Sequence, residues 1–250
     1  MSFRIAVAGK GGVGKSTISA LMVRALHERT GKVVMAVDAD PNSNLGQKLG
    51  LEAERTIGEV REDLLRNVDN LPVGQSKQEY IEYQMRLVTV EGDGFDLLSM
   101  GRPEGSGCYC YVNSILRTFL DLAMERYDHV VIDNEAGMEH LSRRTTKRMD
   151  VLVIVTDYTK VGAETAQRLL ELAKEMEIEV SSTVLLVNMM PPKKNAVLEG
   201  AIDGSGFDTV VRVPRSEEIA RRAEEGLFLF DLPSSDPAYR AVQFFISSIA

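Results

Sequence analysis

Short apolar runs alternate along the chain with longer segments in which apolar residues recur every three or four positions. The short runs predict buried strands, and the longer period predicts helices with one buried face. The expected strands span residues 3–8, 32–37, 130–133, 151–156, 183–188 and 209–213, and the expected helices span 17–29, 112–126, 162–177, 216–225 and 237–249. This alternation predicts an α/β fold with a mostly parallel sheet and helices on both of its faces.

The pattern is weaker between residues 56 and 107, where we expect a pair of strands at 86–90 and 95–98. The chain contains no internal repeat and no convincing linker, so residues 1–250 are expected to form one domain. The last helix carries Arg240 as its only basic residue. Because lipid-binding helices usually need a basic face, we expect this helix to dock on the domain and not on a membrane.

A glycine-rich loop joins the first expected strand to the first expected helix. It reads Gly9-Lys10-Gly11-Gly12-Val13-Gly14-Lys15-Ser16-Thr17. Glycines let consecutive backbone N–H groups point at one anion, and the N-terminus of the helix adds its partial positive charge. In a loop of this pattern the lysine reaches the β- and γ-phosphates of a nucleotide and the serine hydroxyl binds Mg²⁺. Lys15 and Ser16 are therefore expected in those two roles, and the chain in the class of single-domain P-loop NTPases.

Lys10 is an addition that an ordinary phosphate-binding loop lacks. It lies on the outer limb of the loop, where its side chain is poorly placed to fold back on the nucleotide of its own chain. The position suits either a solvated surface lysine or a lysine that projects toward a second subunit, and spacing alone favours neither.

Three aspartates fall where nucleotide chemistry needs carboxylates. Asp38 and Asp40 follow the second expected strand, and Asp133 ends the third, so all three should meet at one edge of the sheet. A carboxylate at the end of an apolar strand beside a phosphate loop steadies Mg²⁺, usually through water, and we expect this of Asp133. The alternative for Asp38 and Asp40 is that they cap a helix that begins near Pro41.

The identity of the nucleotide base is predicted from the absence of an aspartate. Guanine-specific loops place an aspartate shortly after an Asn-Lys pair, whereas Asn188 is followed by Met189-Met190-Pro191. ATP is therefore expected in place of GTP.

Both cysteines of the chain stand close together, in Gly107-Cys108-Tyr109-Cys110. Residues two apart in an extended backbone project to the same side, so Cys108 and Cys110 can act as a pincer for a metal. Two thiolates are an incomplete site for most metals, but two pincers that face each other across a twofold axis supply four. The alternative is a pair of buried structural cysteines.

The amino-acid composition limits the kinds of partner that the chain is expected to bind. The chain has 29 basic and 37 acidic residues and a formal charge of −8. This balance argues against binding to nucleic acid or to anionic membranes. The first strand begins within three residues of the N-terminus and the apolar runs are too short to span a bilayer, so we expect no secretory signal, a cytoplasmic location and reduced thiols.

Taken together, these motifs resemble the ATPases with a deviant Walker A loop, which include the nitrogenase iron protein and the septum-site and partition ATPases. Within that group, the Cys-x-Cys at this position resembles the CooC-type nickel-insertion ATPases, which mature carbon monoxide dehydrogenase. The resemblance implies a homodimer that closes over two ATP molecules, holds nickel between its subunits, and couples hydrolysis to delivery into an apo nickel enzyme. Four thiolates can bind either Ni²⁺ or Zn²⁺, and the sequence does not choose between the two ions.

The resemblance also implies roles for individual residues. Lys10 would cross the dimer interface to the partner's phosphates, Asp40 would orient the attacking water, and Asp38 would help to hold the Mg²⁺ shell. Asn188 and the backbone of Val213-Pro214-Arg215 would contact adenine.

Two other functions stay open. An electron-donating ATPase would hold an iron–sulfur cluster with the same four sulfurs, but such proteins usually carry their two ligating cysteines far apart in sequence. A partitioning or positioning ATPase would assemble on membrane or DNA, which the acidic balance of the chain argues against.

Overall fold

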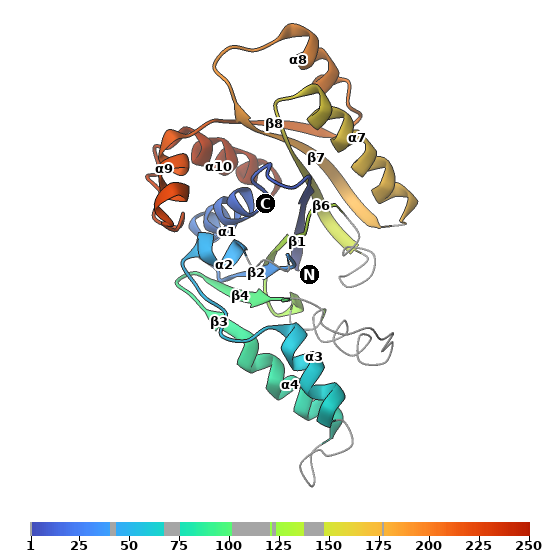
Figure 1. The fold of residues 1–250 in the computed structure, drawn as a ribbon, viewed down its shortest axis with the longest axis vertical. Helices are drawn as coiled ribbons and strands as arrows, with labels where there is room; N and C mark the ends of the chain where they lie inside the picture. Colours follow the sequence, from blue (N-terminus) through green and yellow to red (C-terminus); the bar gives the residue numbers. More distant parts are fainter. Residues whose placement is uncertain are drawn as a thin grey trace.

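An eight-stranded sheet forms the centre of the described part of the chain, with strands in the order β3-β4-β2-β5-β1-β6-β7-β8 (Figure 1). The computed structural model describes residues 2–40, 44–67, 76–101, 121, 124–137, 148–176 and 178–250. The strands are β1 (Phe3–Gly9), β2 (Val34–Asp38), β3 (Thr89–Glu91), β4 (Phe95–Ser99), β5 (His129–Asp133), β6 (Arg148–Asp157), β7 (Glu179–Met190) and β8 (Thr209–Pro214). All neighbouring strands run parallel except β3, which pairs antiparallel with β4.

Helices cover both faces of this sheet, as the alternation of apolar runs and helical segments predicted. They are α1 (Lys15–Thr30), α2 (Asn44–Leu49), α3 (Ile57–Asn67), α4 (Lys77–Val88), α7 (Lys160–Glu175), α8 (Ala196–Asp203), α9 (Glu217–Glu225) and α10 (Pro237–Ile249). Successive residues of β1 alternate between the faces: Ile5 and Val7 pack with α1 and α10, whereas Ala6 and Ala8 pack with α7. The α/β fold predicted from sequence is confirmed.

The terminal helix α10 docks on the domain, also as predicted. Five of its side chains are buried, and the apolar core that contains them also contains α1 and β1. Figure 1 shows α10 lying beside α1. Across the part of the chain that the structure describes, no helix is both long enough and apolar enough to cross a membrane.

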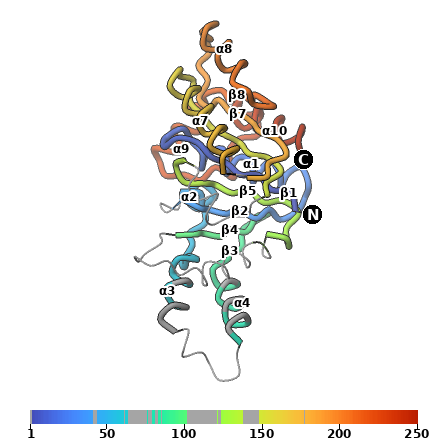
Figure 2. The backbone as a smooth tube through the Cα atoms, turned by 90° about the vertical axis from the view of Figure 1, so that its right-hand side faces the viewer, coloured from blue at the N-terminus to red at the C-terminus, as the bar shows by residue number. Residues whose placement is uncertain are grey.

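The predicted strand at 86–90 is wrong in its first half. Arg86, Leu87 and Val88 belong to α4, and the strand β3 begins only at Thr89. The helix is stabilised at its start by a reciprocal capping box, in which Ser76 accepts from the Glu79 backbone and Glu79 accepts from that of Ser76. Figure 2 shows α3 and α4 together, extending from the β3 edge of the sheet away from the other helices.

Several expectations fall outside the described residues. These are the cysteine motif at 105–111, nearly all of the helix expected at 112–126, and residues 41–43, which precede α2.

Candidate nucleotide site

The glycine-rich loop connects β1 to α1, in the strand–loop–helix order that the sequence predicted. Gly9 has φ 149°, and a Cβ at this position would lie 2.3 Å from the carbonyl oxygen of Val155. Gly14 precedes α1 in the left-handed region, with φ 91° and ψ 28°. Only glycine adopts such conformations without strain, so the loop depends on its glycines for backbone geometry.

The two lysines of the loop differ in burial. Lys15 is 7% exposed, and its Nζ lies 3.4 Å from the carbonyl oxygen of Lys10, so the ammonium group folds back over the loop. That is where the phosphates of a nucleotide would lie. Lys10 itself is exposed. Its exposure fits both a solvated lysine and one that reaches another subunit.

Asp38 and Asp133 are brought side by side at the carboxyl ends of β2 and β5, where the strand register pairs them directly. Neither is exposed to solvent. Burial raises the pKa of Asp38 to about 6, because the hydrogen bonds from the backbones of Leu45 and Asp40 offset only part of the lost hydration. Burial likewise raises the pKa of Asp133 to about 7, although the Ser16 hydroxyl lowers it.

The Asp133 carboxylate is incompletely satisfied. Ser19 donates to its Oδ1 at 3.2 Å, whereas Oδ2 is buried and lacks a hydrogen-bond partner within the described residues. A buried carboxylate oxygen without a donor suits a cation, directly or through water. Asp133, its neighbour Asp38 and the adjacent Ser16 therefore fit Mg²⁺ by the chemistry of their oxygens.

Asp38 also performs the alternative role considered for it. Its Oδ2 accepts from the N–H of Leu45, in the first turn of α2, at 2.9 Å, and its Oδ1 accepts from the N–H of Asp40 at 3.1 Å. Capping of α2 and contact with Mg²⁺ are compatible, because each carboxylate oxygen has more than one lone pair. Asp40 is 8% exposed, at the same edge of the sheet.

The segment after β5 contacts the start of the loop. The N–H of Gly137 donates to the carbonyl oxygen of Gly9 at 3.2 Å. A contact from this N–H to a γ-phosphate would require this hydrogen bond to open.

The residues expected around adenine gather at the ends of β7 and β8. Asn188 donates from Nδ2 to the Val13 carbonyl oxygen at 2.9 Å, so the end of β7 is attached to the phosphate loop. Met190 pairs with Pro214 of β8, and the N–H of Arg215 donates to the Met190 carbonyl oxygen at 3.2 Å. The structure therefore brings together the four residues that the resemblance assigned to the base.

Two features of the site were missed from the sequence. Met189 has φ 53°, the left-handed conformation that side chains rarely adopt, at an irregularity in the β7–β8 pairing. The apolar sequence at the end of this strand does not predict such a bulge. Ser19 was missed because a serine inside a helix usually faces solvent, whereas this one bonds to Asp133 from the buried side of α1.

A glycine-rich loop between a strand and a helix, with strand-end carboxylates beside it, defines a P-loop nucleotide-binding protein that uses Mg²⁺. Residues 5–230 match the family described as the CobQ/CobB/MinD/ParA nucleotide binding domain, and the chain belongs to this family.

Two relatives are similar to this chain over most of its length. It is 42% identical to an uncharacterized ATP-binding protein of Methanocaldococcus jannaschii, an alignment that covers 96% of this chain and 95% of the relative. It is 32% identical to the carbon monoxide dehydrogenase accessory protein CooC of Rhodospirillum rubrum, over 92% of this chain and 90% of that one. Because the family consists of P-loop ATPases, the chain is an ATPase with ATP or ADP and Mg²⁺ as its ligands.

Solved structures confirm the fold. The cell division protein MinD of Aquifex aeolicus matches with a TM-score of 0.71 at 21% identity, over 99% of this chain and 96% of that one. MinD of Pyrococcus horikoshii, solved with Mg-ADP, matches with a TM-score of 0.71 at 19% identity, over 100% and 96% of the two chains. At these identities the likeness concerns the fold alone.

Within the described residues, no group of three or more His, Cys, Asp or Glu side chains could hold a metal ion. Cys108 and Cys110 are not among those residues.

Proposed function

We propose that the chain is an ATP-hydrolysing metallochaperone, which binds nickel through Cys108 and Cys110 and delivers it to a nickel enzyme such as apo carbon monoxide dehydrogenase. One observation carries this proposal: the chain resembles a carbon monoxide dehydrogenase accessory protein over 92% of its length and also contains a Cys-x-Cys pincer. The fold alone does not indicate metal delivery, since proteins named for cell division share it. The cysteine pair alone does not identify which metal is bound.

The phosphate end of the site would act through position and charge. Lys15 neutralises the β- and γ-phosphates, while Ser16, Asp38 and Asp133 hold Mg²⁺ directly or through water. The bound Mg²⁺ supplies charge neutralisation on the phosphate oxygens. Asp40 orients the water that attacks the γ-phosphate, and its position at the sheet edge beside Asp38 supports this role.

A homodimer completes two features that one chain leaves incomplete. Lys10 is exposed on the outer limb of the loop and neutralises charge on the partner's phosphates, in the manner of an arginine finger. The two cysteines of each chain supply half of a four-sulfur site, with Ni²⁺ as the cargo and Zn²⁺ as a competitor. Hydrolysis loosens the interface and weakens the shared site.

Equilibrium dialysis with nickel tests the cargo. Wild-type protein should bind one Ni²⁺ per two chains, and Cys108→Ser/Cys110→Ser protein should lose this binding while it still hydrolyses ATP. Equal nickel binding by both proteins would contradict the proposal. Iron and labile sulfide in anaerobically purified protein, with a visible absorption band, would identify the electron-donating ATPase instead.

The proposed role of Lys10 across the dimer interface is tested separately. Lys10→Ala should abolish the dimerisation that ATP induces, measured by sizing chromatography, and lower the ATPase rate. Lys193→Ala is the matched control, because Lys193 is an exposed lysine in the turn between β7 and α8. Unchanged dimerisation and hydrolysis in Lys10→Ala would remove the crossing role.

The shared fold with MinD and ParA proteins supports a second candidate, a partitioning or positioning ATPase. This candidate predicts that the protein sediments with anionic vesicles or with duplex DNA in the presence of Mg·ATP, and that the cysteine variants do so equally well. Metal delivery predicts no cosedimentation with either.

A further inference from the structure

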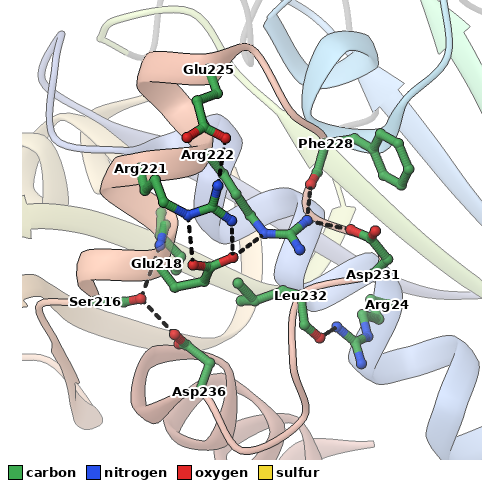
Figure 3. Close-up of polar contacts among 11 residues, drawn as sticks. Arg24, Ser216, Glu218, Arg221, Arg222, Glu225, Phe228, Asp231, Leu232 and Asp236 are labelled. Atoms are coloured by element: carbon green, nitrogen blue, oxygen red, sulfur yellow. Dashed lines mark hydrogen bonds and ion pairs between the residues drawn. The ribbon is translucent and has the colours of Figure 1, made fainter.

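A segment of residues 227–236, which we call the strap, connects α9 to α10 and runs past α1 (Figure 3). It contains no helix or strand, yet it is attached firmly to its surroundings. The N–H of Leu229 donates to the Lys48 carbonyl oxygen at 2.7 Å, and Arg222 donates to the Phe228 carbonyl oxygen at 2.8 Å. The strap is therefore fixed to both α2 and α9.

Arg24 attaches the strap to α1. This residue is 6% exposed, and its guanidinium donates to the carbonyl oxygen of Leu232 and, at 3.0 Å, to the Ser234 hydroxyl. The same guanidinium donates to Glu28 at 2.7 Å and lies 4.1 Å from the ring centre of Tyr239 on α10. Because α1 begins at Lys15, the helix that carries the phosphate loop also holds the strap.

At its far end the strap is bonded to the start of α9. Ser216 donates to Asp236 at 2.5 Å, and both side chains are buried. Ser216 also accepts from the N–H of Ile219 and caps α9, while Asp236 accepts from the N–H of Tyr239 and caps α10. An N-cap ordinarily serves its own helix alone, whereas here the caps of two helices are bonded to each other.

This bond lies next to the residues expected around the base. The strand β8 ends at Pro214 and α9 begins at Glu217, so only Arg215 and Ser216 lie between them. A link this short transmits any displacement of Ser216 directly to Pro214 and Arg215. The strap thus connects the phosphate loop, through α1 and Arg24, to the backbone of residues 213–216, which we call the base-side loop.

We propose that Arg24 and the Ser216–Asp236 pair are positioning residues for the nucleobase, which hold residues 213–216 at a fixed distance from the phosphate loop without touching the nucleotide. The inference rests on the proposed contacts of Val213–Arg215 with adenine. Apolar side chains would pack α1 against α10 equally well, so packing alone does not require a buried arginine. Directional hydrogen bonds instead fix the backbone in one register.

The test compares two ligands, Mg·ATP and Mg·tripolyphosphate, by isothermal titration calorimetry. Tripolyphosphate contains the phosphates without adenosine, so it reports only on the phosphate loop. Ser216→Ala and Arg24→Gln should each weaken Mg·ATP binding about tenfold, the effect of one lost hydrogen bond, and leave Mg·tripolyphosphate binding unchanged. Ser216→Thr keeps the hydroxyl and should restore the affinity for ATP.

Two controls separate positioning from general destabilisation. Ser76→Ala removes a serine cap from α4, far from the base-side loop, and Arg221→Gln removes an arginine whose ion pairs, with Glu218 and Glu225, lie within α9. Both should leave the two affinities unchanged. If Arg24→Gln folds poorly, Ser216→Ala decides the outcome, since it removes a single hydroxyl.

Equal losses for both ligands, or no loss for ATP, would overturn the positioning role. If the wild-type protein binds ATP no more tightly than tripolyphosphate, the adenine contacts themselves are absent and the positioning role falls with them. A wild-type preference for ATP that survives in both variants overturns the positioning role alone.

Discussion

The phosphate end and the base end of the nucleotide site differ in how the chain builds them. The phosphate end consists of nine consecutive residues and the strand-end carboxylates Asp38 and Asp133, which adjacent strands bring together. The base end, as proposed above, is assembled from β7, β8 and the strap, and the hydrogen bond from Arg24 to the strap joins residues 208 positions apart in the sequence. Phosphate binding is thus specified by local backbone geometry, and base binding depends on contacts that form only in the complete fold.

The two ends also differ in electrostatic balance. Asp38 and Asp133 are buried beside each other with raised pKa values, so their charged forms are disfavoured until a cation arrives. At Glu28, the partner of Arg24 near the C-terminal end of α1, burial would raise the pKa, but the hydrogen bonds from Tyr239 and Arg24 outweigh burial and lower it. Ligand binding should therefore relieve an electrostatic cost at Asp38 and Asp133, whereas Arg24 and Glu28 are already paired.

The largest effect is expected where the two ends meet, at Gly14. A Cβ at this position would lie 2.5 Å from Nδ2 of Asn188, and φ is 91°. Gly14→Ala should therefore lower the free energy of unfolding by about 2–4 kcal/mol, from backbone strain and displacement of Asn188 together. Urea denaturation of the nucleotide-free protein measures this change.

Gly12→Ala is the matched control. Gly12 also has a positive φ, of 81°, but its Cβ would meet nothing within 4 Å. It should lose only the strain, about 1–2 kcal/mol. Equal losses in the two variants would show that the contact of the added Cβ at position 14 with Asn188 does not contribute to the loss of stability.

The phosphate end should also be visible in the pH dependence of stability. The folded-state pKa values of Asp38 and Asp133, about 6 and about 7, lie above the ordinary value of 3.8, so the folded protein binds these protons more tightly than the unfolded chain does. The contribution of these two carboxyl groups to the free energy of unfolding is fully present below about pH 4, and it is lost as the pH rises through 6 and 7. Asp133→Asn should flatten the decline between pH 5 and pH 8 by about 2 kcal/mol.

Urea denaturation of both proteins at pH 5 and at pH 8 measures this decline in the free energy of unfolding. Asp208→Asn is a suitable control, since hydrogen bonds from Thr183 hold the pKa of Asp208 below its ordinary value and therefore below the pH range compared. A decline in Asp133→Asn as steep as in the wild type would contradict raised pKa values at the phosphate end.

The same contrast explains what the sequence could predict. The loop at 9–17 was predicted because each glycine and Lys15 act within one short segment, and the strands were predicted from apolar runs of ordinary length. Arg24 gave no such signal, because an arginine in a helix usually faces solvent and its partners in the strap are distant in sequence. The start of β3 was misplaced because Tyr80, Gln84 and Val88 recur every four residues and extend α4 to Val88.

Asn188 is the residue whose loss should affect both ends of the site, by the smallest amount. Its amide donates to the Val13 carbonyl oxygen of the loop, while its Oδ1 accepts from Met189 at 2.8 Å and fixes the bulge beside the base-side loop. Asn188→Ala leaves the Val13 carbonyl oxygen without this donor, so Mg·ATP and Mg·tripolyphosphate should both bind about fivefold to tenfold more weakly. Ser216→Ala should weaken Mg·ATP alone, and the pair of variants therefore separates a residue that serves both ends from one that serves the base. Asn195→Ala, an exposed asparagine that caps α8, makes the same chemical change outside the site and should leave both affinities as they are. A loss for ATP alone in Asn188→Ala would mean that its bond to Val13 does not support the phosphate loop, and that the two ends are independent at this point.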